Sequence, residues 1–247
     1  MSAGPQHEPL FELQAVDVRL GARAQVHALS GVSLRIAAGE RVALVGANGS
    51  GKSSLLRCLH GLLPVASGRL QLAPDLRMAM LFQRPHMLRL SARNNVALGL
   101  WLDGVPWSAA KLQALEALER VGLAGLAQRN ARALSGGQQQ RLALARAWAR
   151  RPGVWLLDEP TASLDPHAKR EVEALITDFA EHSTGNQPST LIFSSHNLGQ
   201  VKRLASRVLY LEQGRLLADL PTADFFNHER LQAMCPQAHA FVKGETP

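Results

Sequence analysis

Residues 42–53 read VALVGANGSGKS, and this stretch decides the class of fold. The apolar run at 42–45 is typical of a strand buried on both faces of a parallel sheet. The residues that follow match the phosphate-loop pattern G-x-x-x-x-G-K-[ST], whose glycines let backbone N–H groups turn toward phosphate oxygens. We expect a helix at 54–63, with the positive end of its dipole at this loop. Lys52 would then neutralise the β- and γ-phosphates of a nucleotide, and the Ser53 hydroxyl would bind Mg²⁺.

Strand and helix patterns alternate along most of the chain, which predicts an α/β fold with a mostly parallel sheet. Further strands are predicted at 11–15, 32–36, 154–157 and 190–193, helices at 136–150 and from 165 onward, a polar loop at 183–189, and a late hairpin at 208–218. Between Gln83 and Ser135 we expect helices and loops without a strand, including one helix that Ser108 caps and Gly122 ends. The sequence therefore predicts a helical insertion into a strand–helix core.

The composition is that of a folded globular protein. The 247 residues are 46% hydrophobic and 19% charged, which excludes intrinsic disorder, collagen-like repeats and a disulfide scaffold. Cys58 and Cys235 fit no metal-ligand spacing, and we interpret them as reduced thiols. We find no apolar run near the ~20 residues of a membrane span and no signal-peptide pattern, so we expect a soluble intracellular chain. The net charge of +7 comes without a dense basic block, which favours dispersed surface charge over nucleic-acid binding.

Two adjacent carboxylates follow the strand predicted at 154–157. Ligands of open α/β sheets bind at the carboxyl ends of the strands, so Asp158 and Glu159 would lie at the same edge as the phosphate loop. Asp158 would hold Mg²⁺, directly or through water, and Glu159 would polarise the attacking water as general base. An Asp-Glu pair at this place can also cap a helix, but the phosphate loop earlier in the chain favours the functional interpretation.

Three further polar positions are candidates. His196 follows a predicted strand and could hydrogen-bond the γ-phosphate and hold the attacking water in line. Gln83 follows a short apolar run and could bring an amide oxygen to Mg²⁺ or to water. Taken alone, both are equally consistent with ordinary polar side chains at strand ends. Ser135, Gly136 and Gly137 begin a predicted helix and form a second anion-binding terminus, separate from the first.

Together, these motifs resemble those of the ATP-binding cassette (ABC) ATPases. Residues 134–138 read LSGGQ, which is the signature of that family, and the other motifs occur in the family's order over nearly the whole chain. They are the Walker A loop at 46–53, Gln83, the signature, the Walker B strand at 154–158, Glu159, the loop at 163–165 and His196. The joint match is very specific, and it makes His196 and Gln83 catalytic candidates.

The resemblance implies a nucleotide site shared between two chains. A homodimer is expected to form head to tail and to enclose ATP between Lys52 of one chain and Ser135 of the other. Glu159, His196 and Gln83 would be the catalytic residues, and Ser53, Gln83 and Asp158 the Mg²⁺ ligands. The residues expected to bind ATP are Gly46, Ala47, Asn48, Gly49, Ser50, Gly51, Lys52, Ser53, Ser54, Ser135, Gly136, Gly137 and Gln138.

The resemblance also implies the architecture. We expect a single ABC ATPase domain over residues 1–247, built on a parallel sheet of the P-loop NTPase type with an N-terminal antiparallel β part. A helical subdomain is expected at 84–150 and a short helical tail at 220–247. The region from Gln83 to about residue 100 would face a membrane partner and couple closure of the dimer to its movement.

The chain departs from the family where adenine binds. The family usually stacks adenine on an aromatic residue upstream of the phosphate loop, often Tyr, but the single tyrosine here is Tyr210. The expected neighbourhood holds Leu20, Arg23 and His27 instead, so we predict looser nucleotide selectivity. Ser54 stands where the family commonly has Thr, a difference that should matter little.

The sequence shows no membrane span, second cassette or regulatory domain, which narrows the resemblance to a stand-alone importer subunit. The stretches 82–95 and 193–207 look most like those of tungstate importer cassettes, with phosphate and molybdate importers as alternatives. The implied partners are separate membrane permease subunits and, indirectly, a periplasmic or extracellular oxyanion-binding protein. The implied location is the cytoplasmic face of a bacterial inner membrane. A soluble non-transport ATPase and an ATP-binding module without hydrolysis are the other functions considered, and intact Glu159 and His196 argue against the second.

Overall fold

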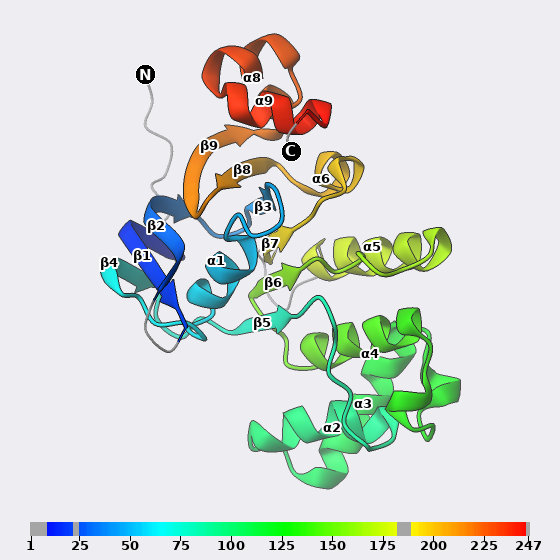
Figure 1. The fold of residues 1–247 in the computed structure, drawn as a ribbon. Coiled ribbons are helices and arrows are strands. Elements are labelled where there is room, and N and C mark those ends of the chain that lie inside the picture. Colours follow the sequence, from blue (N-terminus) through cyan, green and yellow to red (C-terminus); the bar gives the residue numbers. More distant parts are fainter. Residues whose placement is uncertain (1–8, 22–24, 182–188, 246–247) are drawn as a thin grey trace, which may run out of the picture.

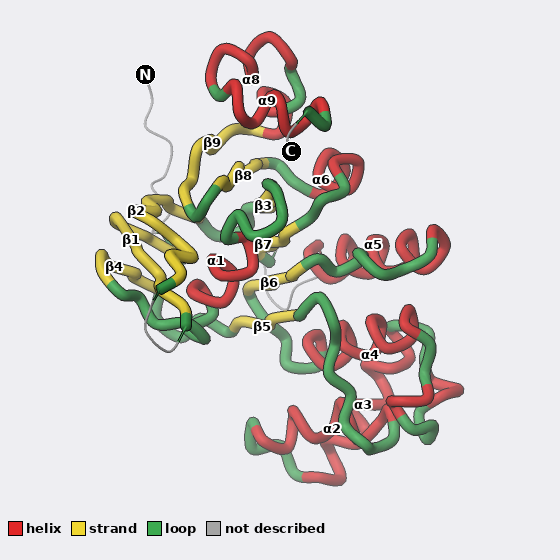
Figure 2. Tube along the Cα trace, viewed as in Figure 1, coloured by secondary structure: helices red, strands yellow, loops and turns green. Residues whose placement is uncertain are grey.

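The structure is a computed structural model, and it describes residues 9–21, 25–181 and 189–245. Two β-sheets and a set of helices make up this part of the chain (Figure 1). Figure 2 shows the three-stranded sheet at one side, the larger sheet in the middle and a group of helices at the far end. The N-terminal segment at 1–8 and all but the last residue of the polar loop predicted at 183–189 lie outside the described residues.

The smaller sheet is antiparallel and has the strand order β2-β1-β4. Its strands are β1 (Phe11–Leu20), β2 (Val26–Ile36) and β4 (Ser67–Leu72). The predicted strands at 11–15 and 32–36 are only parts of β1 and β2, which are longer. The sequence analysis missed β4 because most of its side chains are exposed and the alternation of apolar and polar residues is confined to its short second half. The predicted N-terminal antiparallel part is confirmed.

The larger sheet has the strand order β5-β6-β7-β3-β8-β9. Its strands are β3 (Arg41–Val45), β5 (Met78–Leu81), β6 (Val154–Asp158), β7 (Thr190–Ser194), β8 (Arg207–Glu212) and β9 (Arg215–Pro221). All neighbouring strands are parallel except the β8–β9 hairpin, which confirms the predicted α/β class. Because the strands are parallel, the carboxyl ends of β3, β5, β6 and β7 meet at one edge of the sheet.

Side chains of β3 are buried on both faces of this sheet, as the apolar run predicts. Val42 and Leu44 pack in one hydrophobic core with helix α1 (Lys52–Leu59) and the small sheet, whereas Ala43 and Val45 belong to a second core on the other face. Helix α1 ends at Leu59 rather than at the predicted residue 63. Gly61 follows with φ of 81°, a left-handed conformation that stops a helix and that glycine adopts without strain.

The helices between β5 and β6 form the insertion that the sequence predicts. They are α2 (Ala92–Leu102), α3 (Trp107–Arg120) and α4 (Gly136–Trp148), with short 3₁₀ turns η1 (Ala124–Leu126) and η2 (Ala131–Ala133). Figure 1 shows them together at the end of the molecule away from β1, β2 and β4. The predicted cap at Ser108 is wrong, because α3 begins at Trp107 directly after Pro106, and no side chain caps it. The ring of Pro106 sets the backbone that leads into the helix.

The remaining helices cover the second core and the carboxyl-terminal strands. They are α5 (Pro166–Glu181), α6 (Leu198–Leu204), α7 (Thr222–Phe225), α8 (His228–Met234) and α9 (Pro236–Lys243). Phe179 of α5 stacks between Trp148 and Trp155, with ring centroids 5.8 and 5.5 Å away. In the part of the chain that is described, no helix combines the length and the apolar character needed to cross a bilayer.

His60, at the end of α1, predicts a pH dependence of stability. Burial, together with the charge of Arg150, holds the pKa of His60 below its usual 6.5. In the unfolded chain His60 binds a proton at a higher pH than in the folded chain, so the unfolded state carries more protons in the mildly acidic range. We therefore expect the free energy of unfolding to rise as the pH increases through the mildly acidic range, and to level off above the ordinary pKa of histidine. Urea titrations should show a smaller rise in His60→Gln, and an equal rise would contradict this role.

Candidate nucleotide-binding site

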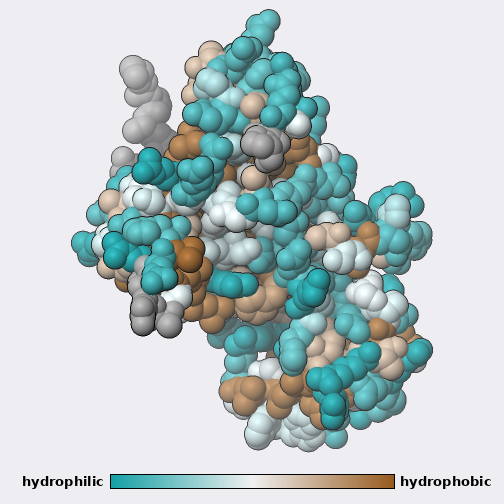
Figure 3. Space-filling model, viewed as in Figure 1, coloured by the Kyte–Doolittle hydropathy of each residue, from teal (hydrophilic) through white to brown (hydrophobic). Residues whose placement is uncertain are grey.

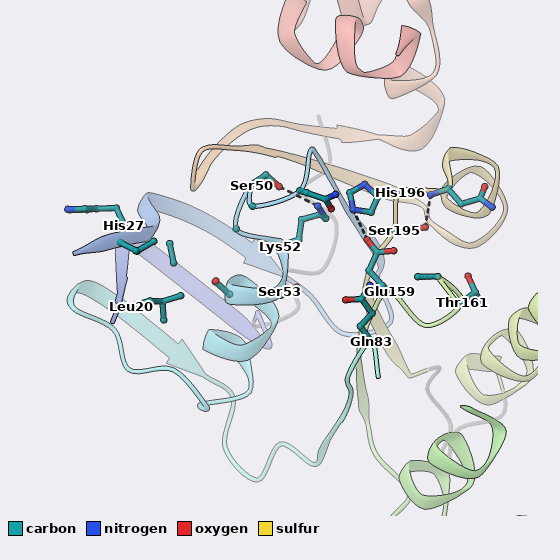
Figure 4. A pocket seen from close by; sticks show the side chains of 18 of the residues that line it. Leu20, His27, Ser50, Lys52, Ser53, Gln83, Glu159, Thr161, Ser195 and His196 are labelled. Carbon is teal, nitrogen blue, oxygen red and sulfur yellow. Dashed lines mark hydrogen bonds and ion pairs between the residues drawn. The ribbon is translucent and has the colours of Figure 1, made fainter. Parts of the chain in front are cut away.

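A cavity of about 700 Å³ opens where β3, β6 and β7 end (Figure 4). Of the residues that the sequence singles out, it is lined by Leu20, His27, Asn48, Gly49, Ser50, Gly51, Lys52, Ser53, Ser54, Gln83, Glu159 and His196. These residues come from six separate segments of the chain. The strand order explains most of the gathering, because the phosphate loop, Gln83, Glu159 and His196 each follow a strand that ends at this edge of the larger sheet. Leu20 and His27 come from strands β1 and β2 of the small sheet.

The phosphate loop lies between β3 and α1, as predicted. Two of its glycines are required because a Cβ atom would clash with neighbouring backbone and because their φ angles are positive. Gly46 has φ of 143°, and a Cβ atom there would lie 2.1 Å from the Leu211 carbonyl oxygen. Gly51 has φ of 107°, and its Cβ would lie 2.7 Å from the Ala28 carbonyl oxygen. Any other residue would push the loop away from β8 or β2.

Lys52 is only 6% exposed, and its ammonium group lies inside the curve of the loop. Nζ donates to the carbonyl oxygens of Gly46 at 2.8 Å and Ala47 at 2.9 Å. Burial lowers the pKa of Lys52, while the nearby carboxylates of Glu159 and Asp158 raise it. A buried cation without a directly paired carboxylate is costly unless an anion joins it, which is what a nucleotide phosphate would do.

Ser53 and Asp158 lie together although they are 105 positions apart in the chain. The Ser53 hydroxyl donates to Asp158 Oδ1 at 2.8 Å, and the Ser194 hydroxyl donates to the same oxygen at 2.8 Å. Mg²⁺ prefers oxygen ligands, takes one or two carboxylates from the protein and completes its shell with water and phosphate oxygens. The hydroxyl and carboxylate oxygens found here fit that donor set. No cluster of three or more His, Cys, Asp or Glu suited to a metal occurs among the described residues.

Glu159 and His196 form a pair across the cavity. His196 Nε2 lies 3.0 Å from Glu159 Oε1, yet the contact is not aligned as a hydrogen bond, and this buried oxygen has no other partner in the structure. Glu159 has φ of 49°, which is unusual for a residue other than glycine and is found at functional sites. Its backbone N–H donates to the Ser194 hydroxyl at 2.9 Å, which holds it in place.

The imidazole of His196 is 41% exposed. Burial and the charge of Lys52 lower its pKa, and the carboxylate of Glu159 raises it by a smaller amount. The net shift is downward, so the neutral imidazole predominates at neutral pH. A neutral imidazole can accept a hydrogen bond from water at one nitrogen and donate one to a phosphate oxygen from the other.

Gln83 follows β5, and its exposed side chain lines the cavity opposite the phosphate loop. Figure 4 shows it below Glu159, with both side chains on the same side of the cavity. The structure therefore brings together the predicted catalytic residues and the predicted Mg²⁺ ligands Ser53 and Asp158, while Gln83 lies across the cavity and is not hydrogen-bonded to either of these two.

The signature residues lie elsewhere. Ser135 is the N-cap of α4, and its hydroxyl accepts from the Gln138 N–H at 3.3 Å while the Gln138 side chain accepts from the Ser135 N–H at 3.0 Å. This reciprocal cap leaves the first N–H groups of the helix, at Gly136 and Gly137, facing outward without partners in the helix. None of these four residues lines the cavity that holds Lys52. The two predicted anion-binding ends therefore do not meet within one chain.

Sequence reasoning missed the residues that support the site from behind. Ser194 binds Asp158 and the backbone of Glu159, and Thr161, Ser195 and Gln200 form a buried hydrogen-bonded group next to them. The available signal was the pair of serines at 194–195, which ends an otherwise apolar strand. Polar residues buried at a strand end normally have hydrogen-bond partners, but the sequence does not say which.

Two aliphatic side chains line the cavity in the neighbourhood where the family resemblance predicts the adenine base. Leu20 and Val26 are direct cross-strand partners in β1 and β2, and both line the cavity. His27 is also at the cavity, but Figure 4 shows its side chain pointing away from Lys52. Arg23 lies outside the described residues. The structure thus favours Leu20 and Val26 over His27 as the surface for a base.

We expect Leu20→Tyr to bind ATP more tightly than the unmodified protein. A base stacked on an aromatic ring gains about 1 kcal/mol over an aliphatic contact, which corresponds to a roughly 5-fold lower Kd. Equilibrium titration with ATP and GTP measures this, and Leu20→Met is the matched aliphatic control. An unchanged Kd in Leu20→Tyr would place the base away from Leu20.

The fold and the cavity define a P-loop ATPase, and comparison with known proteins identifies its family. The family described as ABC transporter matches residues 29–162. The thiamine import ATP-binding protein ThiQ of Jannaschia sp. is 42% identical over 201 residues, which are 77% of this chain and 86% of the relative. The nickel import ATP-binding protein NikO of Rhodobacter capsulatus is 39% identical over 236 residues, which are 87% of this chain and 91% of the relative.

A solved structure agrees with these relatives. It is a dimeric ATP-binding cassette in a post-hydrolysis state, bound to ADP and Pi, with a TM-score of 0.75 and 27% identity over 86% of this chain and 98% of that chain. The chain therefore belongs to the ABC transporter family, and it is an ATPase whose hydrolysis of ATP is coupled to transport. The relatives are named for different cargoes, so they do not identify the cargo here.

Proposed function

We propose that this chain is the ATP-hydrolysing subunit of an ABC importer that powers the uptake of an oxyanion, with tungstate as the cargo. The observation that carries the ATPase site is the convergence of Lys52, the Ser53–Asp158 pair and the Glu159–His196 pair in one cavity. Importer function is supported by the relatives named for import of thiamine and nickel.

At the site, each residue has a role that its position supports. Lys52 and the loop N–H groups bind the phosphates, and Glu159 takes a proton from the attacking water while His196 orients that water. Ser53 and Asp158, with Gln83 across the cavity, would hold Mg²⁺, which when bound neutralises charge on the β- and γ-phosphates. The orphaned Glu159 Oε1 and the neutral His196 are placed to share one water molecule.

We propose that the signature of a second copy completes the site. The N–H groups at the start of α4 favour an anion but lie away from Lys52 of the same chain. A head-to-tail homodimer would bring them to the phosphates held by the partner, so that ATP is enclosed between the two chains. The similarity to a dimeric cassette bound to ADP and Pi supports this arrangement.

A mixing experiment tests the dimer. Ser135→Asp keeps an N-cap acceptor but adds a negative charge at the anion-binding end, and Ser135→Asn is the neutral control of the same size. We expect Ser135→Asp and Lys52→Met each to lose hydrolysis. Mixed in equal amounts, they should recover up to roughly a quarter of the normal rate, because half of the dimers then hold one intact site. No recovery on mixing would contradict a site shared between chains.

We propose that residues 84–150 act as a helical subdomain and that its junction with the core receives the permease. A cavity of about 340 Å³ lies there, lined in part by Phe82, His86, Gly99 and Arg146. Figure 3 shows hydrophobic residues gathered over α2, where Trp101 and Leu102 are 51% and 71% exposed. Large exposed apolar side chains in one place favour a protein partner. The chain would then lie on the cytoplasmic face of the membrane, held there by the permease.

Cargo is tested on the whole transporter. The likeness of 82–95 and 193–207 to tungstate cassettes motivates tungstate, and a relative 40% identical over 224 residues is named for import of phosphonates, which are also oxyanions. We expect ATP hydrolysis by the complex with its permease and binding protein to rise when tungstate is added, and less so with molybdate or phosphate. Stimulation by a cation or an uncharged solute alone would overturn the oxyanion assignment. Co-purification with nucleic acid or a soluble scaffold instead of a permease would overturn import.

A further inference from the structure

We propose that Gln200 is a positioning residue for hydrolysis: its side-chain amide joins the loop that carries Glu159 to the loop that carries His196. Gln200 lies in α6, outside the cavity, and is 1% exposed. Its hydrogen bonds are to Thr161, Ser195 and Asn197, which line the cavity, and none is to the phosphate loop. The inference rests on the proposed roles of Glu159 and His196 and adds a residue that sets their separation.

One end of the Gln200 amide binds the loop after β6. Nε2 donates to the Thr161 hydroxyl at 3.1 Å, and Thr161 is 4% exposed. Thr161 stands two positions after Glu159, and the turn between them is closed by a hydrogen bond from the Ala162 N–H to the Glu159 carbonyl at 3.2 Å. A displacement of Thr161 is therefore passed to Glu159 through a short, hydrogen-bonded turn.

The other end of the amide binds Ser195, in the loop after β7 and directly before His196. The Ser195 hydroxyl donates to Gln200 Oε1 at 2.7 Å and accepts from the Asn197 N–H at 3.0 Å. The Asn197 side chain in turn accepts from the Gln200 N–H at 3.1 Å. The residues before and after His196 are thus both tied to Gln200, while the imidazole itself projects into the cavity (Figure 4).

These bonds give the two catalytic loops a common anchor behind the cavity. The contact between His196 Nε2 and Glu159 Oε1 at 3.0 Å is itself poorly aligned, so it does not fix the separation of the pair. The Gln200 amide fixes this separation, because a movement of either loop would leave one end of a buried amide without its hydrogen-bond partner. In-line attack requires the base and the water to be held closely, and a displacement of about 1 Å can cost up to ~100-fold in rate.

The central variant is Gln200→Met, which keeps the length of the side chain and removes both hydrogen bonds. In full-length protein we expect kcat for ATP hydrolysis to fall roughly 10- to 100-fold, with KM and the Kd for ATP nearly unchanged, because Lys52 and its loop are not touched. Gln232→Met, at an exposed position of α8, is the matched control and should keep the normal kcat.

Thr161 separates positioning from a general loss of structure. Thr161→Val has the same shape but no hydroxyl, and should lower kcat as Gln200→Met does, whereas Thr161→Ser retains the hydroxyl and should restore most of it. The double variant Gln200→Met with Thr161→Val should be no worse than the worse single variant, since both remove the same bond. Thermal melting of each protein checks that the fold is retained.

The outcomes distinguish this inference from the proposed function. Unchanged kcat in Gln200→Met, a matching rise in KM, or multiplicative losses in the double variant would each overturn the positioning role. If Glu159→Gln hydrolyses ATP at the normal rate, Glu159 is not the general base. That result contradicts the proposed function itself, whatever Gln200→Met shows. A loss of kcat in Gln200→Met that Thr161→Val does not share would place the effect at Ser195 alone and refute the bridge.

Discussion

Glu159→Gln should bind ATP and fail to hydrolyse it. The substitution keeps the size of the side chain and its place beside His196, but an amide cannot take a proton from the attacking water. A general base contributes 10²- to 10⁴-fold to rate, so we expect kcat to fall by roughly that factor. Release of inorganic phosphate measures the loss. Size-exclusion chromatography should show a dimer that persists with ATP and is absent with ADP.

The structure explains why this variant should leave the fold intact. Glu159 adopts φ of 49° and donates its backbone N–H to Ser194, and neither feature depends on the carboxylate. The buried Oε1 has no aligned hydrogen bond that the change would break. Unchanged hydrolysis would show that Glu159 is not the general base. Loss of ATP binding would show that the carboxylate of Glu159 is needed to bind the nucleotide.

Lys52→Met should abolish productive ATP binding. The ammonium lies inside the phosphate loop, bonded to the Gly46 and Ala47 carbonyls, and nothing else in the loop carries a positive charge. Removing a preorganised charged donor from such a site costs roughly 100-fold or more in rate. Isothermal titration with ATP and phosphate release measure the two losses. We expect both, in contrast to Glu159→Gln, which should lose only hydrolysis.

The stability of Lys52→Met separates loss of function from unfolding. Replacing a buried charge by an apolar side chain of similar volume is often neutral or stabilising. The melting temperature should therefore stay the same or rise, and Lys243→Met, at the exposed end of α9, provides a control for loss of a lysine charge. A large fall in melting temperature would mean that Lys52 stabilises the fold of the phosphate loop, so that the loss of ATP binding could not be assigned to the missing charge.

The local features of the site could be predicted from sequence with good accuracy. Each motif occupies only a few consecutive residues: the phosphate loop, the carboxylates after β6 and the signature. The residue types in each motif indicate both its chemistry and the backbone conformation that it requires. Gly46 and Gly51 show why, since their backbone angles and the nearby carbonyls admit no side chain. The exposed strand β4 was missed because its sequence pattern is weak. The start of α3 and the end of α1 were predicted wrongly because backbone geometry sets these helix boundaries.

Sequence alone was sufficient for the family, the α/β class and the buried character of the parallel strands, because each of these depends on neighbours in the chain. Only the tertiary structure shows that the signature does not meet Lys52 and that Leu20 faces Val26. It alone shows Gln200 bonded to Thr161, 39 positions away. Such contacts depend on the order of strands in the sheet, which places the loops after β6 and β7 side by side, and no local pattern encodes that order.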